Sequence, residues 1–321
     1  MSKSAPVAST DASASAADLT PLLRHRLVFV TGKGGVGKST VAVALARVAA
    51  RRGLRTLLCE MDAKGSVSAR VGGDSLTFES RLVEPNLWAM VMDTEQSLRE
   101  YLRLFVRIPL LTKVTPLAAV FDFVADAAPG VKEILGIGKL CHEVRQDNYD
   151  IVIVDSEATG HIVSQIAAPR IVGQLAGIGM LRDQTEWMIK ILEDESLCTV
   201  VPVVVPEELV VTETIDLVES IRSQTKTDLS WLVLNRIEAP LVATTDESTW
   251  RALCEVLPPT LCQPMERATK VREIQSVSVN DLKDAVGDVE YIVMPEIGGW
   301  GDDDSKVDVD ETMVVRLGEE L

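Results

Sequence analysis

The sequence predicts an α/β protein with a mostly parallel, doubly wound sheet, helices on both faces and one helical insertion. Short apolar runs rich in β-branched residues alternate with longer segments whose apolar residues recur at helical spacing. A strand, a glycine-rich loop, a helix and a second strand also follow one another within residues 26–62, which is the order of a βαβ unit. Together these observations indicate parallel strands joined by helical crossovers.

The individual elements follow from the same two patterns. Buried strands are expected at residues 26–32, 54–62, 149–155, 198–205, 229–235 and 290–295. One helix is expected over residues 39–53, where the apolar spacing ends at a glycine preceded by arginines, and another over residues 207–223. Residues 94–108 and 128–144 each carry an apolar helical face, so residues 79–145 are expected to form a mostly helical insertion.

The charge balance limits the partners of the chain. The 321 residues include 32 basic and 48 acidic side chains, so the formal net charge is −16 and the pI is near 4.7. Nucleic acids and anionic membrane surfaces favour dense patches of lysine and arginine. We therefore expect no nucleic-acid partner, while a local basic pocket for a nucleotide remains compatible with this charge.

The cysteines and the apolar runs indicate a cytoplasmic protein. The five cysteines are scattered and form no C-x-x-C pair, so the sequence shows neither a zinc motif nor a thioredoxin-like motif. Reduced thiols are typical of the cytoplasm. No run of about 18 uncharged apolar residues is present to span a bilayer. Residues 1–24, rich in alanine and serine, are expected to be a disordered tail, and residues 301–321 an acidic C-terminal tail.

The motif that carries most information is TGKGGVGKST at residues 31–40. It contains the P-loop pattern Gly-x-x-x-x-Gly-Lys-Ser, follows a predicted strand and opens a predicted helix, as a phosphate-binding loop requires. The alternative interpretation is a flexible glycine-rich connection. We expect residues 25–300 to form a single P-loop ATPase domain that binds ATP and Mg²⁺. The residues expected to bind the nucleotide here are Gly34, Gly35, Val36, Gly37, Lys38, Ser39 and Thr40.

Three of these side chains have separate expected roles. Lys38 is expected to bridge the outer phosphates, and the Ser39 hydroxyl to ligate Mg²⁺. Thr40 is expected on the side of the α-phosphate. Because Lys38 already serves the bound phosphates, Lys33 is redundant within its own loop, and its alternative interpretation is a solvated loop lysine.

Polar residues at other strand ends complete the predicted site, because ligands of open α/β sheets gather at the carboxyl ends of the strands. Asp62 is expected to position the attacking water or to reach Mg²⁺ through water, and Asp155 to hold the Mg²⁺ shell in the manner of a Walker B aspartate. Asn235 is expected to hydrogen-bond the adenine base, with Pro295 beside it. The alternatives are a solvated turn carboxylate for Asp62, a strand-capping role for Asp155 and a turn-forming role for Asn235.

These motifs together resemble the family that contains the arsenite-pump ATPase and the cytosolic ATPase that targets tail-anchored membrane proteins. The resemblance covers most of residues 26–297. Residues 155–169, DSEATGHIVSQIAAP, are similar to the family signature D-T-A-P-T-G-H followed by an apolar helix. Residues 203–218, 233–236 and 128–133 are similar to further family segments. In this chain the signature lacks its proline, the segment after Asp62 is divergent, and the zinc C-x-x-C motif is absent.

The resemblance implies a dimer that closes around two ATP molecules and rearranges a helical subdomain. The partner is a second copy or a related ATPase subunit. A P-loop with two lysines is the mark of the deviant Walker A ATPases, which implies that Lys33 acts on the nucleotide of the facing subunit and stabilises charge during phosphoryl transfer. We therefore expect Lys33, Lys38 and Asp62 to be catalytic, and Ser39, Asp62 and Asp155 to serve the metal.

Three functions remain open at this stage. The first is a dimeric, ATP-hydrolysing switch that handles a membrane-protein client or an envelope process, with a membrane partner. The second is the ATPase subunit of a metalloid efflux pump, and the third is a partitioning or positioning ATPase. Apolar side chains of residues 95–135 would suit a client groove, but an ordinary packed helical subdomain is the favoured interpretation, because the insertion is short for enclosing a membrane-spanning helix.

Overall fold

A computed structural model describes residues 19–62, 65–71, 75–101, 103, 131–157, 159–175, 180–238 and 247–296 of the chain. In that part of the chain one sheet contains β1 (Leu27–Thr31), β2 (Thr56–Glu60), β3 (Arg81–Glu84), β4 (Leu87–Val91), β5 (Ile151–Asp155), β6 (Cys198–Val204), β7 (Trp231–Ile237) and β8 (Glu290–Pro295). The strand order is β3-β4-β2-β5-β1-β6-β7-β8. Every neighbouring pair is parallel except β3 and β4. The predicted α/β fold with a mostly parallel sheet is confirmed.

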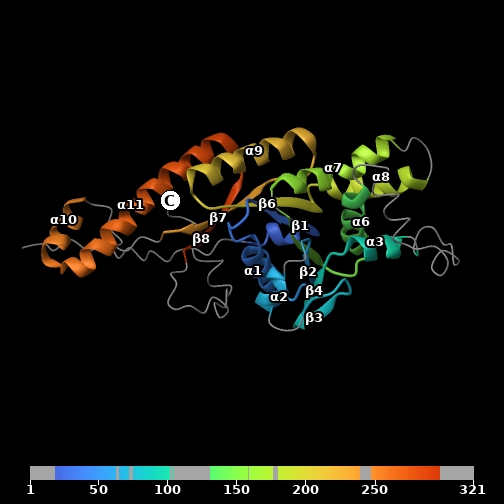
Figure 1. Cartoon of the computed structure of the whole chain (residues 1–321), viewed down its shortest axis with the longest axis horizontal. Helices are drawn as coiled ribbons and strands as arrows, with labels where there is room; N and C mark the ends of the chain where they lie inside the picture. Colours follow the sequence, from blue (N-terminus) through green and yellow to red (C-terminus); the bar gives the residue numbers. More distant parts are fainter. Residues whose placement is uncertain are drawn as a thin grey trace, which may run out of the picture.

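Helices cover both faces of the sheet (Figure 1). The described helices are η1 (Leu22–Arg24), α1 (Lys38–Arg51), α2 (Ser66–Val71), α3 (Thr94–Tyr101), α6 (Val131–Arg145), α7 (Thr159–Leu175), α8 (Met180–Leu192), α9 (Glu208–Gln224), α10 (Glu247–Val256) and α11 (Pro259–Val286). The helices α1 and α2 lie on one face, while α7, α8, α9 and α11 lie on the other (Figure 1). This division follows from right-handed crossovers, because the chain winds in opposite directions away from the central strand β1.

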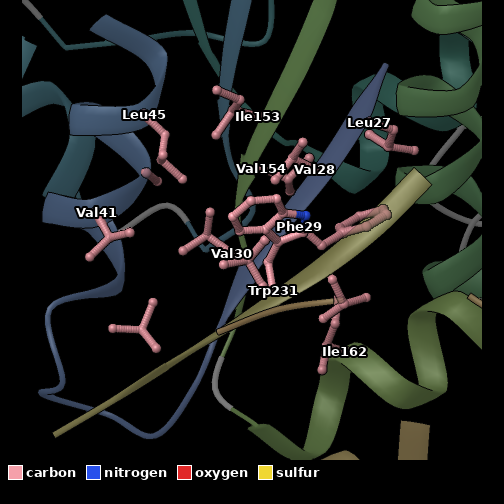
Figure 2. Close-up of a cluster of buried hydrophobic side chains, with 14 of the residues drawn as sticks. Leu27, Val28, Phe29, Val30, Val41, Leu45, Ile153, Val154, Ile162 and Trp231 are labelled. Carbon is pink, nitrogen blue, oxygen red and sulfur yellow. The ribbon is translucent and has the colours of Figure 1, made fainter. Parts of the chain in front are cut away.

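The core is centred on β1, whose five residues are all buried. Figure 2 shows Val41 and Leu45 of α1 on one side of this strand and Ile162 of α7 on the other. The side chain of Phe29 is fully buried among them. A strand covered on both faces must be apolar throughout, which explains why the run at residues 26–32 was recognisable in the sequence. This packing fixes the carboxyl end of β1, where the glycine-rich loop begins.

The first part of the predicted insertion is not helical. Residues 81–84 and 87–91 form β3 and β4, an antiparallel pair that extends the sheet at its edge. Asn86 turns the chain between them with a φ of 61°, a conformation that asparagine tolerates better than most residues. The helical part of the predicted insertion is represented by α3 and α6, which pack on each other. The segment between them, including Leu102 and Phe105, lies outside the described residues.

The boundary of the predicted N-terminal tail is also different. Leu19 and Leu22 are completely buried, and η1 packs the chain against the core before β1 begins. The expectation of a tail over residues 1–24 is therefore wrong for its last residues, because isolated leucines in a polar segment show no periodicity. Residues 1–18 and 301–321, the remainder of the two predicted tails, lie outside the described residues. Among the described helices, none combines the length and apolar composition needed to cross a membrane.

We predict that Leu22→Ala lowers the free energy of unfolding by about 3 kcal/mol, because it leaves a cavity under η1. The control is Leu209→Ala, since the Leu209 side chain is 64% exposed on α9 and its loss is expected to change stability by less than about 0.5 kcal/mol. Urea unfolding of both variants measures the difference. Equal, small effects would show that the segment before β1 does not belong to the folded domain.

Candidate active site

The glycine-rich loop joins the end of β1 to the start of α1. Gly32, Gly35 and Gly37 have φ angles of 144°, 89° and 94°, which glycine adopts without steric cost. Gly37 is the residue immediately before the first turn of α1. Such a loop turns successive backbone N–H groups towards one point, and the helix adds the partial positive charge of its first turn. The expected phosphate-binding conformation is therefore accessible only with glycine at these positions.

Neighbouring strands hold this loop in place. A Cβ atom at Gly32 would lie 2.4 Å from the carbonyl oxygen of Val203 in β6. From the next strand, β7, the Asn235 amide donates a hydrogen bond of 2.8 Å from Nδ2 to the carbonyl oxygen of Val36. A Cβ atom at Gly37 would lie 2.5 Å from the same amide nitrogen. The loop is thus packed against the carboxyl ends of β6 and β7, and two of its glycines are required by close contact as well as by φ.

The position of Asn235 differs from the predicted adenine contact. Its side chain is buried, and its Nδ2 atom is bonded to the phosphate loop, so it does not present both polar atoms of the amide to a base. The contact that the structure shows is therefore a loop-fixing one. Pro295 ends β8 beside the last residue of β7, Ile237, and is half-buried. An adenine contact by Asn235 or Pro295 stays a prediction.

Lys38 lies over its own loop. Its Nζ atom donates a hydrogen bond of 3.2 Å to the carbonyl oxygen of Lys33. Burial raises the pKa of Asp155, which ends the neighbouring strand β5, and the positive charge of Lys38 offsets part of that rise. The side chain is therefore held at the mouth of the loop, near the position predicted for the outer phosphates.

Asp155 is a buried carboxylate with an unsatisfied oxygen. The residue is 5% exposed, and its Oδ1 atom is buried with no hydrogen-bond partner among the described residues. Burial raises the pKa of Asp155, while a hydrogen bond from Ser39 and the charge of Lys38 lower it. An anionic oxygen without a donor is costly in the interior unless a cation satisfies it. Asp155 and Ser39 therefore provide two oxygen ligands of the kind that Mg²⁺ prefers.

A second buried carboxylate, Glu60, was not predicted. Glu60 ends β2 directly beside Asp155 in the register of the two strands, and it is 1% exposed. Its carboxylate accepts hydrogen bonds from the backbone N–H groups of Ser66 at 2.7 Å and Val67 at 3.4 Å, which start α2. Burial raises the pKa of Glu60 further than these bonds lower it, with smaller contributions from the negative charges of Asp155 and Asp62. Glu60 therefore positions α2 relative to the site.

Asp62 follows Glu60 and lies close enough to act on both buried carboxylates. Its charge raises the pKa of Glu60 and of Asp155. Asp62 itself is only half-buried in the bend after β2. The structure thus gathers the predicted Asp62 and Asp155 at one edge of the sheet, together with Ser39. The role of Asp62 in positioning water stays a prediction.

Arg70 is a further cation at the site that sequence patterns did not identify. Its Nε atom donates a hydrogen bond of 3.1 Å to the Thr40 hydroxyl of α1, and its Nη1 atom donates one of 2.7 Å to the carbonyl oxygen of Ser66. The charge of Arg70 also offsets part of the rise in pKa that burial causes at Asp155. Because α2 folds back onto the start of α1, a residue far from the loop in sequence becomes its neighbour. No motif spacing signals that contact.

Lys33 has a partner within its own chain. Its Nζ atom lies 2.7 Å from Oε1 of Glu213 in α9, and the two side chains are 29% and 39% exposed. A part-exposed pair of this kind contributes at most about 1 kcal/mol. It is therefore weak enough to be exchanged for another contact. Reach of Lys33 into a facing subunit stays a prediction.

A groove of about 310 Å³ adjoins Glu213 between α7 and α9. Small residues line it, among them Gly160, Ser164 and Ser220, together with the carboxylates of Glu213 and Asp216. The groove begins at the first turn of α7, which carries the signature-like segment after Asp155. The exposed His161 of that turn lies 3.6 Å from Glu157, as a surface pair does.

This geometry places the chain in the class of P-loop nucleoside triphosphatases, since a glycine cradle, a loop lysine and a strand-end aspartate meet at the carboxyl edge of a parallel sheet. Comparison with known proteins narrows the class. The profile of the ArsA family, described as anion-transporting ATPases, matches residues 25–184. The chain belongs to the ArsA anion-transporting ATPase family, so the resemblance seen in its motifs is confirmed.

Individual relatives span different parts of the chain. ATPase BagA of Mycobacterium tuberculosis is 29% identical over 222 residues, which are 66% of this chain and 65% of BagA. The chain therefore spans slightly less than two thirds of the length of that relative. ATPase get3 of Schizosaccharomyces japonicus is 32% identical over 146 residues, 45% of this chain and 44% of the relative. An ATPase ASNA1 homolog of Entamoeba dispar is 25% identical over 255 residues, 65% and 76% of the two chains.

We predict that Asp155→Asn stabilises the nucleotide-free protein by about 1 kcal/mol at neutral pH, because it removes a buried charge with an unsatisfied oxygen. The folded-state pKa of Asp155 is raised, so its ionisation destabilises the fold above that pKa. The stabilisation by Asp155→Asn should disappear below the ordinary carboxyl pKa of about 3.9, because Asp155 is then protonated in both the folded and the unfolded state. Thermal unfolding between pH 3 and pH 8 measures it.

The control for this prediction is Asp150→Asn. A hydrogen bond from Arg55 lowers the pKa of Asp150, so removal of this charge should destabilise the protein at neutral pH and have no effect in acid. The two variants are thus expected to shift the unfolding temperature in opposite directions. An Asp155→Asn protein that is less stable than the wild type at neutral pH would contradict this description of the site.

Proposed function

We propose that the chain binds and hydrolyses ATP with Mg²⁺, and that it works in the cytoplasm as a dimeric switch that handles a membrane-protein client or an envelope process. The observation that carries the proposal is the buried, unpartnered Oδ1 atom of Asp155 beside Ser39, at the mouth of a glycine cradle. Buried polar atoms without a hydrogen-bond partner are rare in native proteins, so a purely structural role does not explain this oxygen. All five cysteines are free thiols, as is usual in the cytoplasm.

The residues present fit a bound Mg²⁺ ion. Ser39 and Asp155 would hold it, with Asp62 within reach through water, since Mg²⁺ keeps several of its own waters and takes few protein ligands. When bound, the ion would neutralise charge on the outer phosphates. The orphaned oxygen of Asp155 would gain the partner that the described residues do not supply.

The chain's own residues then supply orientation and charge. The loop N–H groups and Lys38 would bind the phosphate oxygens, and Arg70 beside Thr40 would add a second positive charge. Asp62 would orient a water whose oxygen attacks the γ-phosphorus, while the bond to the bridging oxygen breaks and leaves ADP and inorganic phosphate. Asn235 and Val203 keep the cradle in one conformation, so little reorganisation is needed when charge develops.

Dimerisation is supported by the placement of Lys33. The ion pair with Glu213 holds Lys33 at the edge of the phosphate loop, beside the groove between α7 and α9. In the proposed dimer Lys33 exchanges Glu213 for the nucleotide of the facing subunit. That subunit is a second copy or a related ATPase. The acidic groove would then face basic groups of the partner.

Family membership and the resemblance to tail-anchored-protein-targeting ATPases support a membrane-protein client. The metalloid-pump alternative has less support, because Cys59, Cys141 and Cys198 are all completely buried and their pKa values are raised by that burial. Soft metalloids require several convergent thiols. Among the described residues, these three thiols belong to no cluster of metal ligands.

We predict that Lys38→Ala abolishes ATP binding, because it removes the cation at the outer phosphates, whereas Asp62→Asn keeps binding and lowers kcat about 100-fold or more. Lys190→Ala, which removes an exposed lysine from α8, is the control and should behave as wild type. Calorimetry with ATP and release of phosphate measure the two effects. Full turnover by the Lys38→Ala protein would refute the assigned site.

Lys33→Ala is expected to bind ATP and to lose at least about 100-fold in kcat. Because Lys33 is proposed to act across the dimer, mixing Lys33→Ala with Asp62→Asn should restore part of the activity, since one site in each mixed dimer has both groups. Glu213→Gln frees Lys33 and should lower the protein concentration needed for half-maximal activity, while Glu219→Gln on the exposed side of α9 should not. Normal turnover of Lys33→Ala would remove the role in trans.

A further inference from the structure

The helices α10 and α11, between which the chain turns back, lie apart from the active site at the end of the molecule farthest from α3 (Figure 1). Leu257 and Pro258 separate the two helices. The reversal of direction brings Cys254 of α10 close to Cys262 of α11. Glu266 follows Cys262 by one helical turn and lies on the same face.

The three side chains converge on one point. One ligand atom from each of Cys254, Cys262 and Glu266 lies within 4.8 Å of the other two. The distance between Sγ of Cys262 and Oε1 of Glu266 is 3.7 Å. A tetrahedral zinc ion with a Zn–S bond of about 2.3 Å and a Zn–O bond of about 2.1 Å separates its sulfur and oxygen ligands by about 3.6 Å. The sulfur–oxygen distance therefore already matches one edge of a zinc tetrahedron.

The chemistry of the cluster also suits zinc. Zinc takes thiolate sulfur and carboxylate oxygen as ligands, and its binding displaces the thiol protons. Glu266 is exposed and Cys254 is half-buried, so an ion has access from solvent.

We propose that Cys254, Cys262 and Glu266 bind one Zn²⁺ ion within a single chain, with the fourth position open to water. Mg²⁺ is excluded because it prefers oxygen ligands, and arsenite is disfavoured because only two thiols converge. The other three cysteines are completely buried and lie outside this cluster. The ion would join α10 to α11 across the break at Pro258, and so would hold the two helices in one relative orientation.

The sequence did not reveal this site. The spacing of its two cysteines corresponds to no known zinc motif, and the contact exists only because the chain reverses between α10 and α11. Cys262 and Glu266 are four positions apart, which is a helical spacing, but one cysteine and one glutamate on a helix are not a site by themselves. Cys254 supplies the third ligand from another element.

The test is a titration of the reduced full-length chain with Zn²⁺ against a competing chelator. One ion is expected per chain, with an affinity at least about tenfold weaker in Glu266→Gln and lost in Cys254→Ser combined with Cys262→Ser. Glu273→Gln, on the same helix but outside the cluster, is the control and should bind as wild type. Co²⁺ substitution should give thiolate charge-transfer absorption that the double cysteine variant lacks.

Two further measurements separate this site from the active site and from misfolding. Lys38→Ala should bind zinc as wild type, so failure of the ATPase proposal does not affect the result. Zinc should slow proteolysis between α10 and α11 in the wild type and not in the double variant, whose circular dichroism should remain native. The proposal is overturned if the double variant binds zinc with wild-type affinity and stoichiometry, if the wild type binds no zinc, or if the reduced chain shows no thiolate–Co²⁺ absorption.

Discussion

The close packing of a glycine loop against the ends of two strands is the constraint on which the rest of the site depends. Gly32 fits against the Val203 carbonyl only because it has no Cβ, and Asn235 of the adjacent strand donates a hydrogen bond to the Val36 carbonyl. These contacts determine where α1 begins. The position of α1 in turn places Lys38, and every proposed phosphate contact depends on that position. The core around β1 therefore serves chiefly to hold the end of one strand still.

The carboxylates at the carboxyl ends of the strands repel one another, and this repulsion favours the binding of a cation. Besides burial, the charges of Asp155 and Asp62 raise the pKa of Glu60, and the charge of Asp62 also raises the pKa of Asp155, so the edge is unfavourable for the protein alone. Lys38 and Arg70 offset part of that cost. A site with this balance gains most from a ligand that brings both a divalent cation and phosphate oxygens. The close carboxylates thus lower the stability of the ligand-free protein and allow it to bind a charged ligand.

The predictable features of the fold are those that repeat along the chain. The strands around β1 are buried on both faces, so their apolar runs and their order with the phosphate loop were evident from the sequence. The strands β3 and β4 were missed because both are short and because β3, which forms the edge of the sheet, has no fully buried residue. In the site, Lys38, Ser39 and Asp155 followed from motif spacing. Arg70 and the partner of Lys33 did not, because both contacts join elements that only tertiary packing brings together.

The central claim is that this cradle binds ATP together with Mg²⁺, and calorimetry tests it most directly. ATP is titrated into the wild-type protein with Mg²⁺ and again with a chelator in place of the ion. One nucleotide should bind per chain, with an affinity at least about tenfold higher when Mg²⁺ is present, since Asp155 then gains its missing partner. Absence of binding heat at millimolar ATP, or an ATP affinity that is the same with and without Mg²⁺, would contradict this account.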